Sequence, residues 1–115
     1  MIRIAIPIFH DRVSPVLDSC TRLLIINFEG KIEVERREIP FDIYSRSERF
    51  EILKNLSPDV IICCGISEVL DKMLQSAGIR LISGIAGDVE QVAEAFLRNR
   101  IDDSCFRMPG YKEDG

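Results

Sequence analysis

The stretch Asp59-Val60-Ile61-Ile62-Cys63-Cys64-Gly65-Ile66-Ser67 decides the fold class that this sequence predicts. Its continuous apolar run, 59–64, is typical of a strand that is covered on both faces. Gly65 interrupts the run, and apolar residues then recur at helical spacing over 67–77, with Gly78 just past the end. A buried strand followed by a helix is the repeating unit of an α/β protein.

The segments on either side extend this unit into a sheet. We expect strands over residues 2–8, 22–28, 32–39, 59–64 and 79–83. We expect helices over 45–57, over 67–77 and from Asp88 onwards. A tight turn at Gly30 favours antiparallel pairing of the early strands, whereas helices separate the later ones. This order predicts an α/β protein with a three-layer α/β/α arrangement and a mixed sheet.

Length and composition indicate one packed domain. The chain has 115 residues, of which 46% are hydrophobic and 30% are charged, so it can bury a core without disulfide bonds. We therefore expect a single domain over residues 1–115. The tail 101–115 has no clear periodicity, and we expect part of it to be flexible.

Charge and hydropathy exclude two classes of partner. A formal net charge of −4 and dispersed arginines argue against nucleic-acid binding, which needs a basic surface. No apolar run approaches the roughly 20 residues of a membrane-spanning helix, and the N-terminus lacks the pattern of a secretory signal. We expect a cytoplasmic protein that does not contact a membrane.

The candidate metal ligands include the four cysteines, Cys20, Cys63, Cys64 and Cys105. We expect them to be reduced in a cytoplasmic chain of this size, and they form no C-x-x-C pair. Alternating side chains place Cys63 and Cys64 on opposite faces of one strand, which favours core packing for Cys63. Cys64 lies at the strand end and is either a ligand or a small core residue. Cys20 lies in a polar stretch and is expected to be accessible, whereas we expect no role for Cys105.

Three loops should meet beyond the carboxyl ends of the strands, where α/β sheets bind their ligands. They cover residues 9–16, 64–67 and 83–88. The first contains His10, the only histidine of the chain. If the first and fourth strands are neighbours, His10 lies near the two adjacent cysteines. Imidazole and thiolate are suitable ligands for iron, although a loop histidine is also commonly a solvated side chain.

Other chemistry has weaker signals. Gly84-Ile85-Ala86-Gly87-Asp88 opens a helix whose backbone amides favour anions, but a tight turn is the simpler explanation of its glycines. No dinucleotide or nucleoside-triphosphate motif occurs. A nucleophile would have only His10 as its base, so we expect no enzymatic activity. A thiol enzyme would require a cysteine of lowered pKa beside His10.

Several segments, in order along residues 2–100, together resemble a known family. They are Ile4-Ala5-Ile6-Pro7, Arg12-Val13-Ser14-Pro15-Val16-Leu17-Asp18, Leu23-Leu24-Ile25-Ile26, the stretch 59–67, Ala77-Gly78-Ile79 and Gly87-Asp88-Val89-Glu90. On these segments the chain resembles the dinitrogenase iron-molybdenum cofactor biosynthesis family. That family includes NifX-type and NafY-type accessory proteins and the C-terminal domain of NifB.

The resemblance implies a ribonuclease H-like fold with a five-stranded mixed sheet. It also implies a non-catalytic carrier that binds or passes an iron-sulfur or iron-molybdenum cluster between donor and acceptor proteins. Cys64 is the expected metal ligand, with Cys20 and His10 as helpers. The loop residues expected to contact the cofactor beside them are Ser14, Gly65 and Gly87.

The sequence departs from the family pattern at several soft ligands. Val16-Leu17-Asp18 stands where many members have His-Phe-Gly. Ala86 and Tyr111 stand where another subgroup has cysteines. Binding is then weak, shared between the two subunits of a homodimer, or absent. The alternative function is a metal-independent interaction or regulatory module that binds a small anion or a protein partner.

Overall fold

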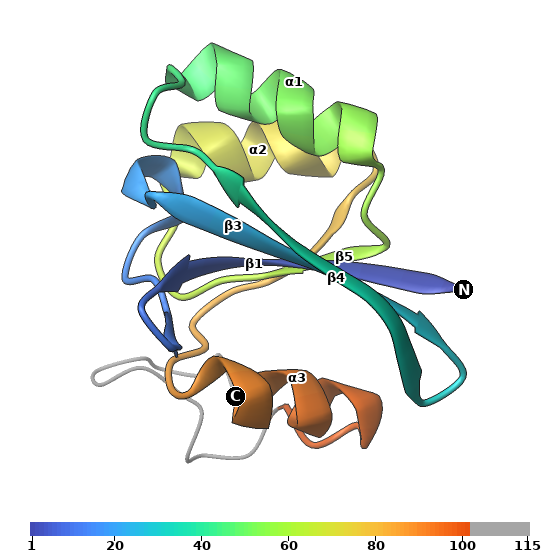
Figure 1. The fold of residues 1–115 in the computed structure, drawn as a ribbon. Helices are drawn as coiled ribbons and strands as arrows, with labels where there is room; N and C mark the ends of the chain where they lie inside the picture. Colours follow the sequence, from blue (N-terminus) through green and yellow to red (C-terminus); the bar gives the residue numbers. More distant parts are fainter. Residues whose placement is uncertain (102–115) are drawn as a thin grey trace, which may run out of the picture.

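The computed structural model of the chain describes residues 1–101 (Figure 1). The strands are β1 (Ile2–Phe9), β2 (Arg12–Val13), β3 (Arg22–Glu29), β4 (Ile32–Pro40), β5 (Val60–Ile62) and β6 (Arg80–Ile82). The helices are α1 (Arg46–Leu56), α2 (Glu68–Ser76) and α3 (Val89–Leu97), with a short 3-10 turn, η1, over Leu17–Ser19. The expected tail falls almost wholly on residues outside the described part.

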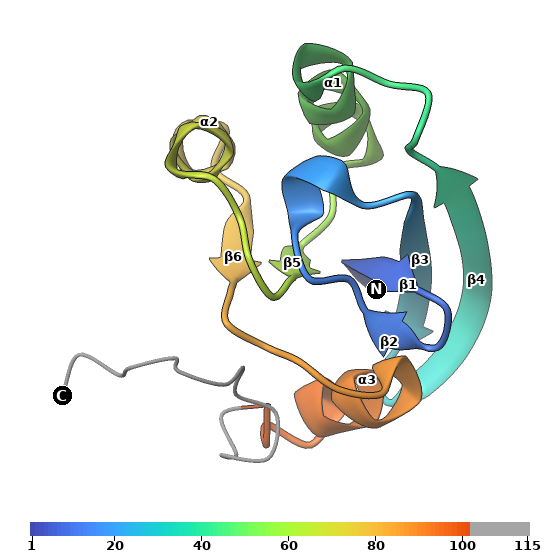
Figure 2. The ribbon, with the colours of Figure 1, turned by 90° about the vertical axis from the view of Figure 1, so that its left-hand side faces the viewer.

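The sheet is mixed, and it has helices on both faces. Its order is β4-β3-β1-β5-β6, with β2 paired to β1 off this path. The pairs β4·β3 and β3·β1 are antiparallel, whereas β1·β5 and β5·β6 are parallel. α1 and α2 cover one face and α3 covers the other (Figures 1 and 2). The predicted three-layer α/β/α architecture is confirmed.

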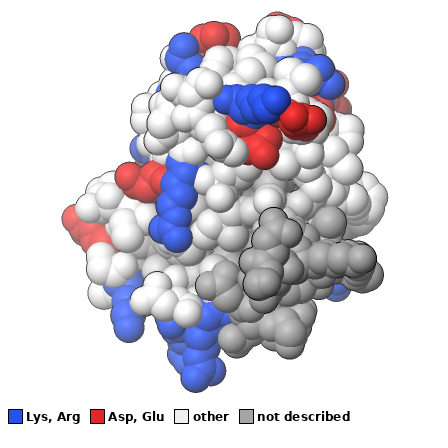
Figure 3. Space-filling view, turned by 180° about the vertical axis from the view of Figure 1, so that it is seen from behind, with Lys and Arg blue, Asp and Glu red and all other residues white. Residues whose placement is uncertain are grey.

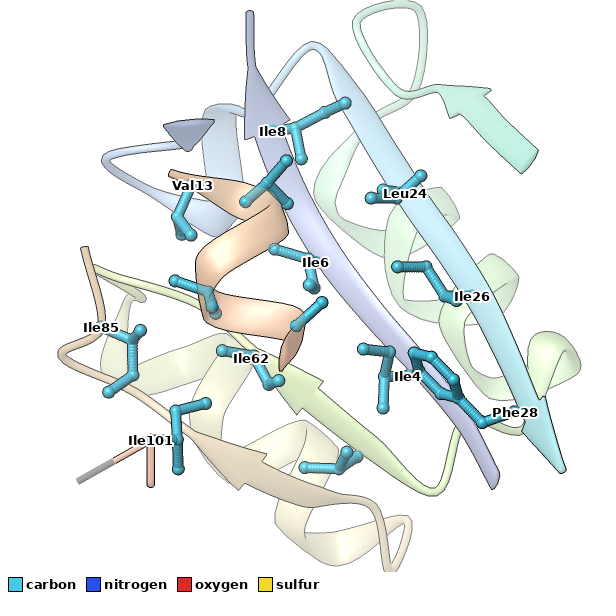
Figure 4. Packing of buried hydrophobic residues seen from close by; sticks show 14 residues of the cluster. Ile4, Ile6, Ile8, Val13, Leu24, Ile26, Phe28, Ile62, Ile85 and Ile101 are labelled. Atoms are coloured by element: carbon cyan, nitrogen blue, oxygen red, sulfur yellow. The ribbon is translucent and has the colours of Figure 1, made fainter. Parts of the chain in front are cut away.

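Each face of the sheet carries its own apolar core, because side chains alternate along the strands. Ile4, Ile6 and Ile8 of β1 point towards α3, together with Leu24 and its alternate neighbours on β3 (Figure 4). Ala5 of β1 belongs instead to the core beneath α1 and α2. Each large side chain that is fully buried contributes about 1.5–3 kcal/mol to folding.

The helix and turn signals in the sequence are confirmed. Ser45 caps α1 in a reciprocal box with Glu48, and Asp88 caps α3. Gly30 joins β3 to β4 with a φ of 60°, and Gly78 follows α2 with a φ of 78°. None of the helices within residues 1–101 has the length and apolar character needed to cross a membrane.

The first loop is more ordered than we predicted. β1 continues to Phe9 and turns back into β2, so that Phe9 pairs with Arg12. Such a two-residue hairpin turn favours positive φ, and His10 takes a φ of 55°. The expectation of a loop over residues 9–16 was therefore wrong in part. The sequence did not reveal the hairpin, because its two turn residues, His10 and Asp11, are not the usual Asn-Gly pair.

The charged strand β4 lies at the edge of the sheet, as its sequence predicts. Not all of its charged side chains are simply exposed to solvent, however. Arg36 Nη2 donates to Glu33 Oε1 at 2.7 Å and to Glu90 Oε1 at 2.9 Å. These bonds raise the pKa of Arg36 and lower the pKa of Glu90. Arg36 thereby links the edge strand to the first turn of α3.

Candidate functional site

The first two of the three expected loops meet at the carboxyl edge of the sheet. Gly65 N donates to Pro15 O at 2.8 Å, and Leu17 N donates to Gly65 O at 2.8 Å. This reciprocal pair forms an isolated parallel bridge between Val16 and Gly65. Backbone hydrogen bonds therefore join the loop after β5 to the loop after β2.

The third loop is fastened to the first in the same way. Val13 N donates to Gly87 O at 3.0 Å, and Val89 N donates to Asp11 O at 2.8 Å. Arg12 and Asp88 form an isolated antiparallel bridge between these contacts. The predicted convergence of three loops is confirmed.

Gly65 permits the closest of these approaches. A Cβ atom on Gly65 would lie 2.7 Å from Pro15 O, closer than side chains are found to approach backbone oxygen. That oxygen accepts from Gly65 N, and the next bond of the bridge, from Leu17 N to Gly65 O, holds the same two backbone segments together. The structure thus gives Gly65 a steric role in joining the loops. Its expected contact with a cofactor stays a prediction.

The N-terminus of α2 is filled by a carboxylate of the chain itself. Asp18 accepts from Ser67 N at 2.7 Å and from Ser67 Oγ at 2.6 Å. Ser67 Oγ in turn accepts from Leu70 N at 3.2 Å, and Arg46 Nε lies 3.4 Å from Asp18. Because of these bonds, Asp18 occupies the place at which an anionic ligand would meet α2. Sequence reasoning missed this contact.

The N-terminus of α3 is satisfied internally as well. Asp88 accepts from Glu90 N and Gln91 N at 3.0 and 3.1 Å, while Val89 N donates to a backbone carbonyl. Gly84 and Gly87 both have positive φ, 77° and 128°. These angles support the tight turn, rather than an anion site, as the reason for the two glycines.

Cys20 and Cys63 are buried beneath α1 and α2, with exposed fractions of 1% and 0%. The core role predicted for Cys63 is confirmed. The accessibility predicted for Cys20 is wrong, because η1 turns Leu17 and Cys20 inward from an otherwise polar segment. Burial raises the pKa of Cys20 to about 11 and that of Cys63 to about 12.

Cys64 lies on the opposite side of the sheet from these two thiols. It is half-buried, and it packs against the core that faces α3. Burial raises its pKa as well. The three described thiols therefore have raised pKa values, whereas a thiol enzyme would need a lowered one. Cys105 lies outside the described residues.

His10 lies apart from the cysteines. It is exposed, and its ring meets Phe9 with centroids 4.4 Å apart. It lines a pocket of about 350 Å³ between the sheet and the start of α3. The other lining residues are Ile8, Asp11, Arg22, Leu24, Arg36, Glu38, Val89 and Glu90. Although β1 and β5 are neighbours as expected, the pocket beside His10 contains no cysteine among residues 1–101.

The expected site residues are only partly brought together. Ser14, Gly65 and Gly87 lie in the joined loops, and Ser14 is buried with its amide donating to Pro7 O at 2.8 Å. Cys64 adjoins these loops, whereas Cys20 lies across the sheet. Within residues 1–101, no group of three His, Cys, Asp or Glu side chains is placed to hold a metal ion.

The buried thiols make stability fall at alkaline pH. A raised pKa means that the unfolded state loses its thiol proton first, near the ordinary thiol value of 9.0. Stability from Cys20 and Cys63 should thus be complete below pH 9 and lost as pH rises towards their folded values. We expect a slope of up to about 1.4 kcal/mol per pH unit for each thiol. Urea denaturation of wild type and Cys63→Ala at several pH values measures the contribution of Cys63 to this slope. If the stability of both proteins changed in parallel with pH, the expected contribution of the thiol would be contradicted.

Solved structures share this fold. PH0822 has a TM-score of 0.81 at 20% identity, covering 90% of this chain and 96% of that one. A Methanocaldococcus jannaschii protein, provisionally named a dinitrogenase, has a TM-score of 0.72 at 23% identity, covering 85% and 89%. A Thermotoga protein, provisionally named NifB, has a TM-score of 0.72 at 17% identity, covering 100% of both chains.

At these identities the comparisons establish a common fold. No protein-family model matches the chain, and no curated protein matches its sequence. The mixed sheet, with five strands in its main path and helices on both faces, agrees with the architecture that the sequence resemblance implied. Two of these structures bear dinitrogenase and NifB names.

Proposed function

We propose that this protein carries an iron-containing cluster, of the iron-sulfur or iron-molybdenum type, with Cys64 as its thiolate ligand. The observation that supports this most is the position of Cys64. It follows β5 at the carboxyl edge, where three loops meet, and it is half-buried while Cys20 and Cys63 are enclosed. A metal deprotonates a coordinating thiol, so the raised pKa of Cys64 is no obstacle to binding.

One thiolate suits transfer better than storage. A closed site for iron needs several soft donors, and Cys20 lies on the far side of the sheet. The remaining ligands would come from a donor or acceptor protein, or from a second copy in a homodimer. Loading and release are then easier than from a closed four-ligand site, which agrees with a cytoplasmic carrier rather than an enzyme.

Anaerobic reconstitution with ferrous iron and sulfide tests the proposal. We expect wild type to bind iron and to show visible absorption, and Cys64→Ser to lose both. Cys20→Ala is the matched control, because it removes a thiol from the opposite face. Circular dichroism must show that each variant is folded. Equal iron content in wild type and Cys64→Ser, including none in either, would overturn the proposal.

The second candidate is a metal-independent interaction or regulatory module. It is favoured by one observation, the lack of a three-residue metal-ligating group within residues 1–101. A module of this kind should retain its partner or anion binding when every cysteine is replaced. Binding that survives those replacements, in a protein that takes up no iron, would favour this candidate over the carrier.

A further inference from the structure

A pocket of about 520 Å³ opens at the end of the molecule opposite the three loops. Ile2 and Arg80 lie at the start of β1 and β6, and Gly30 and Lys31 form the β3–β4 turn. Ile82, Phe96, Leu97, Asn99 and Ile101 complete the lining. Figure 1 shows the N-terminus, the β3–β4 turn and the end of α3 on the same side of the molecule.

The inner wall of this pocket is apolar. Ile101 is 7% exposed and belongs to the core that faces α3 (Figure 4). Ile82, Phe96 and Leu97 pack against the same core but are only partly buried. Ile2 is 40% exposed at the mouth. Among residues 1–101, no side chain covers this apolar surface, which a ligand could therefore contact.

The two charged side chains of the pocket are both cations. Lys31 and Arg80 are exposed, and the lining includes no carboxylate among residues 1–101. Within that part of the chain, neither side chain makes an ion pair or a side-chain hydrogen bond. Arg36, by contrast, is held by two glutamates. Lys31 and Arg80 therefore place two positive charges beside the apolar wall.

Nearby carboxylates do not neutralise these cations. Glu33 and Glu94 line an adjoining pocket with Lys31, but they pair with Arg36 and Arg98. Asp71 lines another pocket with Arg80 but forms no ion pair with it; among residues 1–101 its side chain accepts from the side-chain amide of Gln75 at 2.6 Å. Figure 3 shows basic side chains at the lower left edge of the molecule, at the end where α3 lies.

We infer that this pocket binds an amphipathic carboxylate, a small molecule with an aliphatic or aromatic body and one carboxylate. The body covers Phe96, Leu97 and Ile82, and the carboxylate lies between Lys31 and Arg80. A guanidinium binds a carboxylate through two parallel hydrogen bonds, and an ammonium adds a third donor. A volume of this size is within the usual range for small-molecule sites.

Titration of the full-length 15N-labelled protein with octanoate tests the inference by NMR. We expect saturable shifts at the amides of the pocket, such as Gly30, Ile82 and Leu97. Octanol and octyltrimethylammonium should bind at least about tenfold more weakly, because they lack the charge that the two cations recognise. Equal binding of octanol would overturn the inference, as would shifts confined to other parts of the protein or none at millimolar octanoate.

Variants of the two cations separate charge recognition from apolar adsorption. Lys31→Gln with Arg80→Gln should weaken octanoate about tenfold or more, and both sites are exposed, so folding should be unaffected. Lys72→Gln, on α2, is the matched control and should bind as wild type does. Unchanged affinity in the double variant would refute the inference. Octanoate binding should persist in Cys64→Ser, so the outcome is independent of the carrier proposal.

Discussion

Replacing Arg49 by methionine is expected to lower the free energy of unfolding by about 3 kcal/mol. Arg49 lies on the inward face of α1 and is only 6% exposed. Nη1 donates to Cys20 O at 2.7 Å, and Nε donates to Tyr44 O at 3.0 Å. The guanidinium also lies 5.4 Å from the ring centroid of Phe41. Methionine would fill much of the volume while leaving two carbonyl oxygens without their donors.

The expected loss comes from those unpaired acceptors. Within residues 1–101, Arg49 makes no ion pair with a carboxylate, so its removal leaves no buried negative charge without a partner. Each buried carbonyl that loses its donor costs about 1–3 kcal/mol, whereas the hydrophobic side chain recovers part of this. The charge of Arg49 also opposes the raised pKa of Cys20. The variant should therefore raise that pKa further.

Urea denaturation at pH 7 measures the effect, with Arg98→Met as the matched control. Arg98 is exposed, and within residues 1–101 its one ion pair is with Glu94, so its replacement should change stability by less than about 0.5 kcal/mol. Equal stability of Arg49→Met and wild type would contradict the expectation. It would mean that the cost of burying the guanidinium cancels its hydrogen bonds.

The sheet, the helices and their inward faces were predictable because their signals are local. Ile4, Ile6 and Ile8 follow the two-residue period of a strand, and each lies in the core facing α3. The capping box of α1 needs only Ser45 and Glu48, three residues apart, to be recognised. Such patterns report backbone conformation within a few residues, and they do not depend on the rest of the chain.

The polar contacts of the candidate site were not predictable in the same way. Asp18 binds Ser67, the N-cap residue of α2, which lies 49 residues later in the chain, and nothing in the local sequence identifies this partner. The same segment misled the prediction for Cys20. Its neighbours Asp18, Ser19 and Thr21 are polar, but one 3-10 turn rotates the thiol into the core. A turn of this length leaves no periodic signal that distinguishes inward from outward side chains.

The separation of the expected ligands has a similar origin. The strand order correctly places β1 beside β5, and it suggested that His10 and Cys64 share a site. A hairpin after β1, however, places His10 in a pocket with β3, β4 and α3. Strand order fixes which loops are adjacent, whereas the turn conformation decides the direction of each side chain.

Replacing Gly65 by alanine is expected to lower the free energy of unfolding by about 3 kcal/mol. The new Cβ would lie 2.7 Å from Pro15 O and 3.5 Å from a methyl group of Val16. The oxygen belongs to backbone that is held by hydrogen bonds, so it cannot move aside as a flexible side chain would. Relief of the contact must then break the bonds of Gly65 with Pro15 and Leu17, each 2.8 Å long.

Gly78→Ala is the control that separates this steric effect from backbone conformation. Gly78 has a φ of 78°, but nothing lies within 4 Å of its would-be Cβ. Alanine there should cost only about 1–2 kcal/mol, from the left-handed conformation alone. Gly65 has no such conformational constraint, so a larger loss at Gly65 in urea denaturation must come from the contact with Pro15. If Gly65→Ala were no worse than Gly78→Ala, the three loops would be less rigidly joined than their hydrogen bonds indicate.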